Sequence, residues 1–189
     1  MGLAFARAAL AAGHNVIATS RNPSKSSKLV SEFTSQGSHW LPLDVTLPDE
    51  TLNAQLDVAI DLYGRIDVLL NNSGIQHLGA FEDQPIDIVR GIYETNVFGT
   101  WRVTRKIVPV IREQKSGHII FNTSMLGFIA LPQAAAYTSS KHALTGLADC
   151  LSWEMAPFGV RVSLSLLKYM YILNIPNVFI RCSCWNQVA

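Results

Sequence analysis

Residues 66–74 read Ile-Asp-Val-Leu-Leu-Asn-Asn-Ser-Gly, and they give the clearest indication of the fold class. Its largely apolar first half, residues 66–70, has the length and the residue types of a buried strand. A helical pattern precedes it, because Leu52, Leu56 and Ala59 recur at the spacing that places them on one side of a helix. An apolar strand that follows an amphipathic helix is typical of a parallel sheet covered by helices on both faces.

The same alternation of helix and strand continues on both sides of this stretch. Further strands are predicted at residues 15–19, 40–43, 118–122 and 160–164, and helices at residues 3–12, 48–63, 86–113 and 134–155. Gly91, Gly99 and Pro109 are weak points in the longest of these helices. In a chain of 189 residues, this pattern predicts one doubly wound, Rossmann-like α/β domain.

Polar residues gather where three of the predicted strands end. Residues 71–74 follow one strand, residues 122–124 end another, and residues 20–23 follow a third. Ligands of open α/β sheets bind beyond the carboxyl ends of the strands. We therefore expect these three clusters to converge on one ligand-binding edge.

The composition excludes several classes of protein. A hydrophobic fraction of 49% with 15% charged residues excludes a disordered chain, and a net charge of +1 gives no electrostatic reason to bind nucleic acid. Cys150, Cys182 and Cys184 cannot form a disulfide framework, so a reducing, cytoplasmic location is expected. The histidines do not fall at metal-ligand spacing, so no metal site is expected. Polar residues and Pro176 interrupt the apolar run at residues 164–180, so a membrane span is not expected there.

Tyr137 and Lys141 lie one turn apart in a predicted helix, which places a phenol and an ammonium on the same face. A free tyrosine has a pKa near 10, and a fixed cation beside it favours the phenolate. Lowering that pKa by about three units takes roughly 4 kcal/mol, which is more than a partly solvated lysine supplies alone. A tyrosine poised in this way can give a proton to a carbonyl or accept one from an alcohol.

The Tyr-x-x-x-Lys pattern alone is weak, but two further polar residues strengthen it. Ser124 ends the strand before this helix, and its hydroxyl is placed to share a substrate oxygen with the phenol. Asn96 lies in a mostly apolar part of the long helix and is placed to hold a water against Lys141. Taken singly, each has a plainer explanation, because a serine at a strand end is usually solvated and a helical asparagine usually faces water.

Four motifs follow one another along the chain: Asn71-Asn72-Ser73-Gly74, Asn96-Val97-Phe98-Gly99, Ser124-Met125-Leu126-Gly127 and Tyr137-Thr138-Ser139-Ser140-Lys141. Their order and spacing resemble the successive motifs of the short-chain dehydrogenase/reductase family, from about Met1 to Leu164. The resemblance implies that Tyr137 is the catalytic acid/base and that Lys141 lowers its pKa and holds the nicotinamide ribose. It also implies that Ser124 orients the substrate and that Asn96 supports the proton relay.

The resemblance implies a nicotinamide cofactor as well. The turn at residues 71–74, chiefly Asn72, would line the cofactor cleft beside Tyr137 and Lys141. Asp44 would lie near the adenine. Gly2 would be the last residue of the glycine-rich phosphate turn, because its spacing from Gly13 matches the family.

The residues after the strand at 15–19 predict which cofactor is preferred. In this fold an acidic side chain there binds a ribose 2′-hydroxyl, whereas an arginine accommodates a 2′-phosphate. Ser20 and Arg21 hold this position, with Lys25 close behind. A guanidinium can bind a phosphate through two parallel hydrogen bonds, although an arginine in a solvated polar turn is the alternative. We therefore expect NADP(H) rather than NAD.

The chain departs from the family pattern at both ends. The first strand and the earlier glycines have no counterpart before Gly2, and that strand is central in the strand order 3-2-1-4-5-6. The sheet is therefore expected to be incomplete, with unpaired edges on the strands at 15–19 and 66–70. No match continues after about Leu164, where the substrate-binding part should follow. We expect a partial domain at residues 1–164 and an anomalous hydrophobic tail at residues 165–189.

These observations predict an oxidoreductase that transfers a hydride between NADP(H) and a ketone or secondary alcohol. One alternative is a non-catalytic truncated isoform or gene-model fragment of such an enzyme. Another, disfavoured by the turn at residues 71–74, is a nucleotide-sugar epimerase or dehydratase. Phe128, Ile129 and Leu131 favour a hydrophobic small-molecule substrate. Homo-oligomers form in the family through the helices that match residues 86–113 and 134–155.

Overall fold

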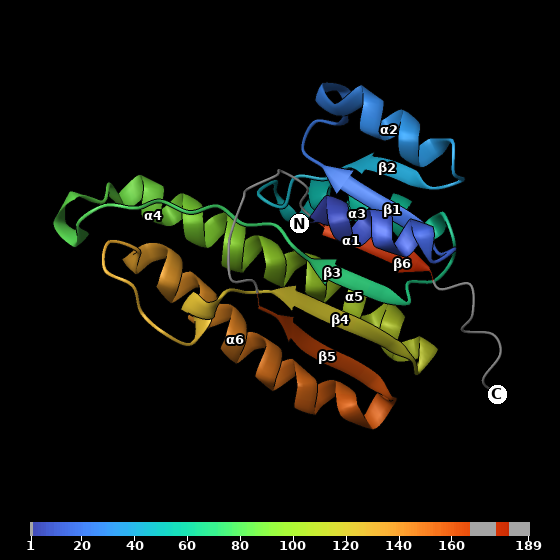
Figure 1. Cartoon of the computed structure of the whole chain (residues 1–189). Coiled ribbons are helices and arrows are strands. Elements are labelled where there is room, and N and C mark those ends of the chain that lie inside the picture. The colour runs from blue at the N-terminus through green and yellow to red at the C-terminus, as the bar shows by residue number, and fades with distance from the viewer. Residues whose placement is uncertain (1, 167–176, 182–189) are drawn as a thin grey trace.

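A six-stranded sheet forms the centre of the molecule (Figure 1). The computed structural model describes residues 2–166 and 177–181. Its strands are β1 (Asn15–Ser20), β2 (His39–Pro42), β3 (Val68–Asn71), β4 (Gly117–Asn122), β5 (Val160–Ser165) and β6 (Asn177–Arg181). Most of the tail expected after Leu164, including Cys182 and Cys184, lies outside the described residues.

Helices connect these strands, and short helical turns flank several of them. The α-helices are α1 (Gly2–Ala11), α2 (Ser27–Thr34), α3 (Asp49–Asp61), α4 (Ile86–Tyr93), α5 (Thr100–Gln114) and α6 (Ala135–Met155). The shorter elements are η1 (Pro23–Ser26), η2 (Phe81–Asp83), η3 (Glu94–Gly99), η4 (Met125–Gly127) and η5 (Ala156–Phe158), of which η3 is a π-helix and the others are 3-10 helices.

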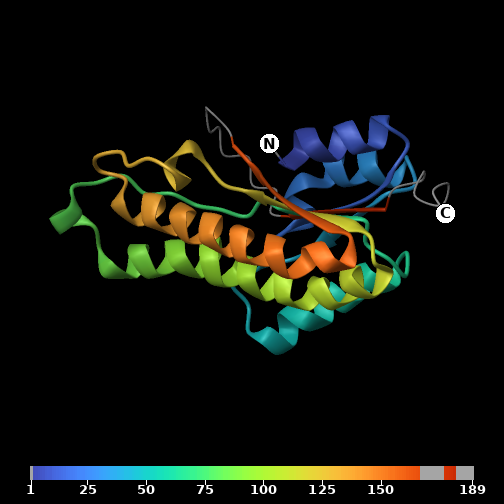
Figure 2. The ribbon, with the colours of Figure 1, turned by 90° about the horizontal axis from the view of Figure 1, so that it is seen from below.

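The strand order is β2-β1-β6-β3-β4-β5. β1 pairs with β2 in parallel, and β3, β4 and β5 form a second parallel group. Helices lie on both faces of this sheet: α1 and α2 cover one side, and α3, α5 and α6 cover the other (Figure 2). The predicted doubly wound α/β fold is therefore confirmed.

β6 corrects the expectation of unpaired strand edges in the middle of the sheet. It lies between β1 and β3 and pairs antiparallel with both, so that Val178 stands opposite Ala18 on one side and Leu70 on the other. Val178 and Phe179 are both buried. A five-residue segment from the expected tail thus hydrogen-bonds the backbone of β1 and β3, which would otherwise be left without partners in an apolar interior.

Two hydrophobic clusters hold the helices to the sheet, one on each face. Below the sheet, Leu52 and Leu56 of α3 and Ile107 of α5 pack with Phe121 and Phe179 in the larger cluster. Above it, the second cluster joins α1, α2 and the opposite sides of β1 and β6; its buried residues are Ala6, Ala9, Val16, Ala18, Phe33, Trp40, Leu70 and Val178. Because side chains alternate along a strand, β6 contributes to both clusters.

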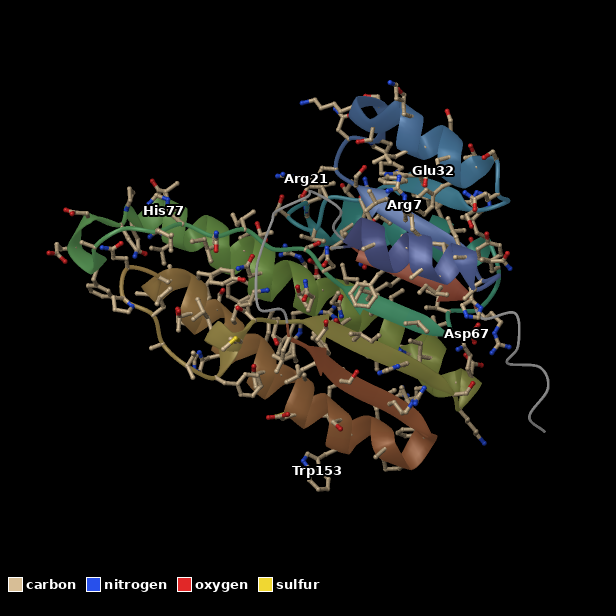
Figure 3. All side chains as sticks on the ribbon, in the orientation of Figure 1. Arg7, Arg21, Glu32, Asp67, His77 and Trp153 are labelled. Carbon is tan, nitrogen blue, oxygen red and sulfur yellow. The ribbon has the colours of Figure 1, made fainter. Side chains whose placement is uncertain are left out.

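Two differences from the sequence-based expectation concern helices. The helix α2, which the sequence reading left out, packs Phe33 against Trp40 edge to face, and its Glu32 forms a two-point ion pair with Arg7 of α1 (Figure 3). The long helix expected at residues 86–113 is interrupted by the π-helix η3, which ends at Gly99. A side chain at Gly99 would meet Val45 at 2.7 Å, so only glycine lets the helix approach this loop.

Candidate active site

The candidate site is built where β3 and β4 end side by side. Asn71 closes β3 and donates a hydrogen bond from its side-chain amide to Thr104 of α5 at 3.0 Å, which anchors the turn that follows. Asn122 closes β4, and its side-chain amide donates to the Asn72 Oδ1 at 2.8 Å. Two of the three polar clusters expected at one edge are therefore in direct contact.

Tyr137 and Ser124 come together across the gap between α6 and the turn after β4. Ser124 begins the short helix η4, where its hydroxyl accepts a hydrogen bond from the Leu126 N–H at 3.2 Å. The Ser124 side chain also hydrogen-bonds the Tyr137 side chain. Burial raises the pKa of Tyr137 above its ordinary value, and the hydrogen bond with Ser124 lowers it in part.

Lys141 lies one turn further along α6, with its ammonium 5.5 Å from the centre of the Tyr137 ring. Only 3% of the residue is exposed, and the Nζ donates a hydrogen bond to the main-chain carbonyl of Asn122 at 2.9 Å. Burial lowers the pKa of Lys141 to about 8. The expected depression of the Tyr137 pKa is not seen in this state of the protein, because desolvation of the phenol outweighs the other influences on it.

Asn96 holds the turn after β3 against α6. It is fully buried within η3, its Oδ1 accepts from the Ile75 N–H at 2.8 Å, and its Nδ2 donates to the Ile75 carbonyl at 2.9 Å. The same Nδ2 donates to the Ser140 hydroxyl at 3.0 Å. Both amide hydrogens are therefore engaged, so any water held against Lys141 would have to use the remaining lone pair of the Oδ1.

Two glycines lie where these segments meet, and one of them allows their close approach. A Cβ at Gly74 would lie 3.5 Å from both the Asn96 Oδ1 and the Lys141 Nζ, so the turn passes directly over the lysine. A Cβ at Gly127 would lie 2.8 Å from the Thr145 Oγ1 and 3.1 Å from the Lys141 carbonyl, which is closer than real contacts allow. The turn after β4 can therefore rest on α6 only if residue 127 is glycine.

The residues predicted to bind the cofactor's far end lie at the ends of β1 and β2. The Ser20 hydroxyl accepts a hydrogen bond from the Trp40 indole at 2.9 Å, and the exposed Arg21 follows directly (Figure 3). Lys25 is also exposed, in η1. Asp44 accepts hydrogen bonds from the Thr46 N–H and hydroxyl, at 3.0 and 2.7 Å. Gly2 is buried at the first turn of α1.

Sequence reasoning missed two residues of this site. Asn122 was grouped with the polar strand end but given no role, and it contacts both Asn72 and Lys141. Ser140 was treated as part of a motif, and its hydroxyl links the Asn96 amide to the Tyr137 carbonyl at 2.7 Å. For Ser140, the signal that the sequence offers is a serine directly before Lys141 in a predicted helix.

Three buried oxygens at these strand ends accept no hydrogen bond from the described residues: the Asn71 Oδ1, the Asn122 Oδ1 and the Thr123 Oγ1. Buried polar atoms in proteins are normally paired, so such a group at the end of two parallel strands is consistent with a polar ligand or bound water there. Within residues 2–166 and 177–181, no group of three potential metal ligands occurs, and no helix is long and apolar enough to cross a membrane.

Comparison with known proteins identifies the family. The family model for short chain dehydrogenases matches residues 1–170, which extends slightly beyond the limit expected at Leu164. Oxidoreductase BOA17 of Botryotinia fuckeliana is 38% identical over 163 residues, which cover 86% of this chain and 59% of that protein. Dehydrogenase/reductase SDR family member 7B of Mus musculus is 34% identical over 90% of this chain and 54% of its own length. The chain thus spans little more than half the length of these relatives.

Solved structures agree with this identification. A short-chain dehydrogenase from Streptomyces avermitilis superposes with a TM-score of 0.81 at 37% identity, over 86% of this chain and 59% of that one. An NAD+-bound xylitol dehydrogenase and ElxO with NADP bound each give a TM-score of 0.73 at 26% identity, over 78% of this chain and 58% and 60% of theirs. From the motifs, the fold and these matches together, the chain belongs to the short-chain dehydrogenase/reductase family of oxidoreductases.

Proposed function

We propose that this protein is an NADP(H)-dependent oxidoreductase that transfers a hydride between the cofactor and a ketone or secondary alcohol. The observation that carries the proposal is the hydrogen bond between Ser124 and Tyr137, made beside an ammonium that lies 5.5 Å from the tyrosine ring. A proton donor, a hydroxyl that shares its acceptor and a buried cation are the groups that carbonyl reduction needs.

Each of the four residues has a distinct task in this proposal. Tyr137 gives its hydroxyl proton to the carbonyl oxygen in the reductive direction and takes it back in the oxidative one. Ser124 hydrogen-bonds the same oxygen and so fixes its position. Lys141 places a positive charge beside the oxygen that gains electrons. Asn96 clamps the turn at Ile75, which keeps the wall of the site in place.

The pKa directions favour reduction over oxidation at neutral pH. Burial raises the pKa of Tyr137, so the hydroxyl keeps its proton and is available as an acid. Lys141, with a pKa of about 8, is largely protonated at pH 7 and can stabilise a developing negative charge. Oxidation of an alcohol needs the phenolate, whose formation burial opposes.

The residues present fit a nicotinamide dinucleotide phosphate. The structural neighbours contain NADP or NAD, and the bound nucleotide would supply or accept the hydride. Tyr137, Lys141 and Asn72 would hold the nicotinamide side, and Gly2 at the start of α1 would face the phosphates. Arg21 stands directly after β1 and is exposed, as a group that binds a 2′-phosphate must be. Asp44 would lie near the adenine.

A hydrophobic substrate is supported by the turn after β4. Met125, Phe128, Ile129 and Leu131 are all exposed there, next to Ser124. The Gly79 N–H donates to the Gln133 carbonyl at 2.9 Å, which ties this turn to the loop after β3. Apolar side chains on two joined loops beside the proton donor would form one wall for an apolar substrate.

A second candidate function is that of a non-catalytic protein with this fold. The observation that favours it is β6, which lies antiparallel at the position between β1 and β3. A parallel strand at that position would lead into a glycine-rich phosphate turn, whereas β6 runs in the opposite direction. Binding of the pyrophosphate would then depend on α1 alone.

Titration with NADPH separates the two candidates. If the protein is an active enzyme, NADPH fluorescence increases on binding, because the reduced ring is shielded from water. Tyr137→Phe should abolish turnover of a hydrophobic ketone and leave NADPH affinity within about twofold, because it removes the transferable proton alone. A folded sample that shows no binding at millimolar NADPH would sink the catalytic proposal.

A further inference from the structure

Asn122 contacts both sides of the candidate site at once. Its main-chain carbonyl accepts a hydrogen bond from the Lys141 Nζ at 2.9 Å, and its side-chain amide donates to the Asn72 Oδ1 at 2.8 Å. One residue at the end of β4 therefore joins the lysine on α6 to the turn after β3. A strand end fixed by ladder pairing with β5, where Asn122 stands opposite Ser165, is a rigid base for such a link.

Stability alone does not account for an asparagine at this position. The Asn122 Oδ1 is buried and accepts no hydrogen bond from the residues that the structure describes. An acceptor buried without a donor is unfavourable, so an apolar or smaller side chain would serve folding at least as well. The function of the Asn122 amide is therefore to bind the Asn72 side chain.

Among the groups around the Lys141 ammonium, the main-chain carbonyl of Asn122 accepts its hydrogen bond and so orients it. The Tyr137 ring approaches the ammonium from α6, and the turn at Gly74 lies over it, with Asn96 of η3 behind that turn. Tyr137 is the titratable side chain that faces Lys141 from these elements, and it is neutral below its raised pKa. The carbonyl of Asn122 thus directs one N–H of the ammonium toward β4.

We propose that Asn122 is a positioning residue for hydride transfer, which holds Lys141 and the Asn72 turn in fixed relation so that both meet the same cofactor. The proposal rests on the function proposed above. It differs from the roles of the four catalytic residues, because Asn122 acts through Lys141 and Asn72 and not on the substrate.

Two substitutions of the Asn122 side chain test this proposal, each with a matched change at Asn53, a half-buried residue of α3. Asn122→Ala removes the amide and keeps the carbonyl. Its Tm should equal or exceed that of Asn53→Ala, while the Kd for NADPH rises about tenfold, as expected for the loss of one well-placed hydrogen bond. A similar Kd in both alanine variants, or a Tm loss confined to Asn122→Ala, would overturn the proposal.

Asn122→Asp puts a carboxylate on the residue whose main-chain carbonyl binds the lysine. The titration of Lys141, followed by NMR of lysine labelled with carbon-13 at Cε and assigned with Lys141→Met, should shift upward by about one pH unit. Asn53→Asp should leave it unchanged. A midpoint in Asn122→Asp within a few tenths of the wild-type value would contradict the placement. This measurement needs no cofactor, so it distinguishes a failure of the positioning proposal from a failure of wild-type protein to bind NADPH.

Discussion

Lys141 brings a charge into a part of the protein from which water is almost excluded. Its ammonium donates a hydrogen bond to a main-chain carbonyl and faces the Tyr137 ring, and burial lowers its pKa to about 8. The protein therefore stabilises the charged form poorly in the absence of ligand. A polar ligand whose hydroxyl groups accept hydrogen bonds from this ammonium would offset part of the free-energy cost of burying the charge.

The depressed pKa of Lys141 predicts an unusual dependence of stability on pH. Between about pH 8 and pH 10.5 the unfolded chain binds a proton at this lysine that the folded chain does not, so the free energy of unfolding should rise with pH. The expected slope is about 1 kcal/mol per pH unit near pH 9. Tyr137 acts in the opposite direction above its ordinary pKa of 10, so urea denaturation should be followed from pH 7.5 to 9.5.

Lys141→Met is the control for this titration. It removes the group and should flatten the slope over the same interval, while Lys115→Met, at an exposed helix end, should leave the slope as it is in the wild type. If the free energy of unfolding of the wild-type protein is constant or falls from pH 8 to pH 9.5, the pKa of Lys141 is not lowered in the folded protein.

At the level of single residues, the sequence allowed the types of side chain in the site to be predicted but not their contacts. Tyr137, Lys141, Ser124 and Asn96 stand in recognisable spacing, and the helix pitch places the first two together. Gly99 marks a weak point of the predicted helix, but the contacts of Asn96 with Ile75 and Ser140 join segments far apart in the sequence and cannot be predicted from local spacing. The same holds for the contacts of Asn122 with Asn72 and Lys141.

Among the elements, the short strand β6 pairs with two inner strands of the sheet. It is five residues long, yet β1 and β3 both depend on it for backbone hydrogen bonds. These residues fall in the tail expected after Leu164, where the resemblance to the family's motifs ends. Pairing between a strand and neighbours more than a hundred residues away cannot be predicted from a local pattern, whereas the helices expected at residues 48–63 and 134–155 correspond to α3 and α6.

Phe179 provides a test of whether β6 belongs to the core. Its side chain is 1% exposed and packs in the larger cluster, so Phe179→Ala should lower the free energy of unfolding by about 3–5 kcal/mol in urea denaturation. Phe81→Ala is the matched control, because Phe81 is 82% exposed and its truncation should cost less than about 0.5 kcal/mol. Equal effects of the two substitutions would contradict the central position of β6.

The helix α2 could not be predicted because its sequence is compatible with both a helix and a turn. Leu29, Val30 and Phe33 have helical spacing, but the segment is only eight residues long and is rich in serine, which favours turns as much as helix. Packing of Phe33 on Trp40 and the Arg7–Glu32 ion pair decide the outcome. Neither contact can be derived from the segment itself.

On the scale of the whole molecule, the face formed by α5 and α6 carries large exposed aromatic side chains. Phe98 and Trp101 lie near the start of α5, and Trp153 projects from α6 (Figure 3). Exposed aromatic residues on neighbouring helices are typical of protein interfaces. We propose that these exposed side chains join two copies of the chain.

Trp101→Lys tests the proposed interface by sedimentation velocity. The wild-type protein should sediment as a dimer or larger, and the variant should move toward the value of a 20.8 kDa monomer, because a charge in the interface has no partner. Val58→Lys on α3, where Val58 is equally exposed, should leave the oligomeric state unchanged. A wild-type monomer at tens of micromolar would rule out this interface.

The antiparallel β6 also has a consequence for how the chain reaches its native state. The described strand latest in the sequence occupies an inner position, between β2-β1 on one side and β3-β4-β5 on the other. Both halves precede β6 in the sequence, and among the described strands only β6 pairs with both of them. Closure therefore waits for a contact of very long sequence separation, which slows folding. Until residues 177–181 pair, the facing edges of β1 and β3 stay open, and unpaired strand edges of this kind favour aggregation.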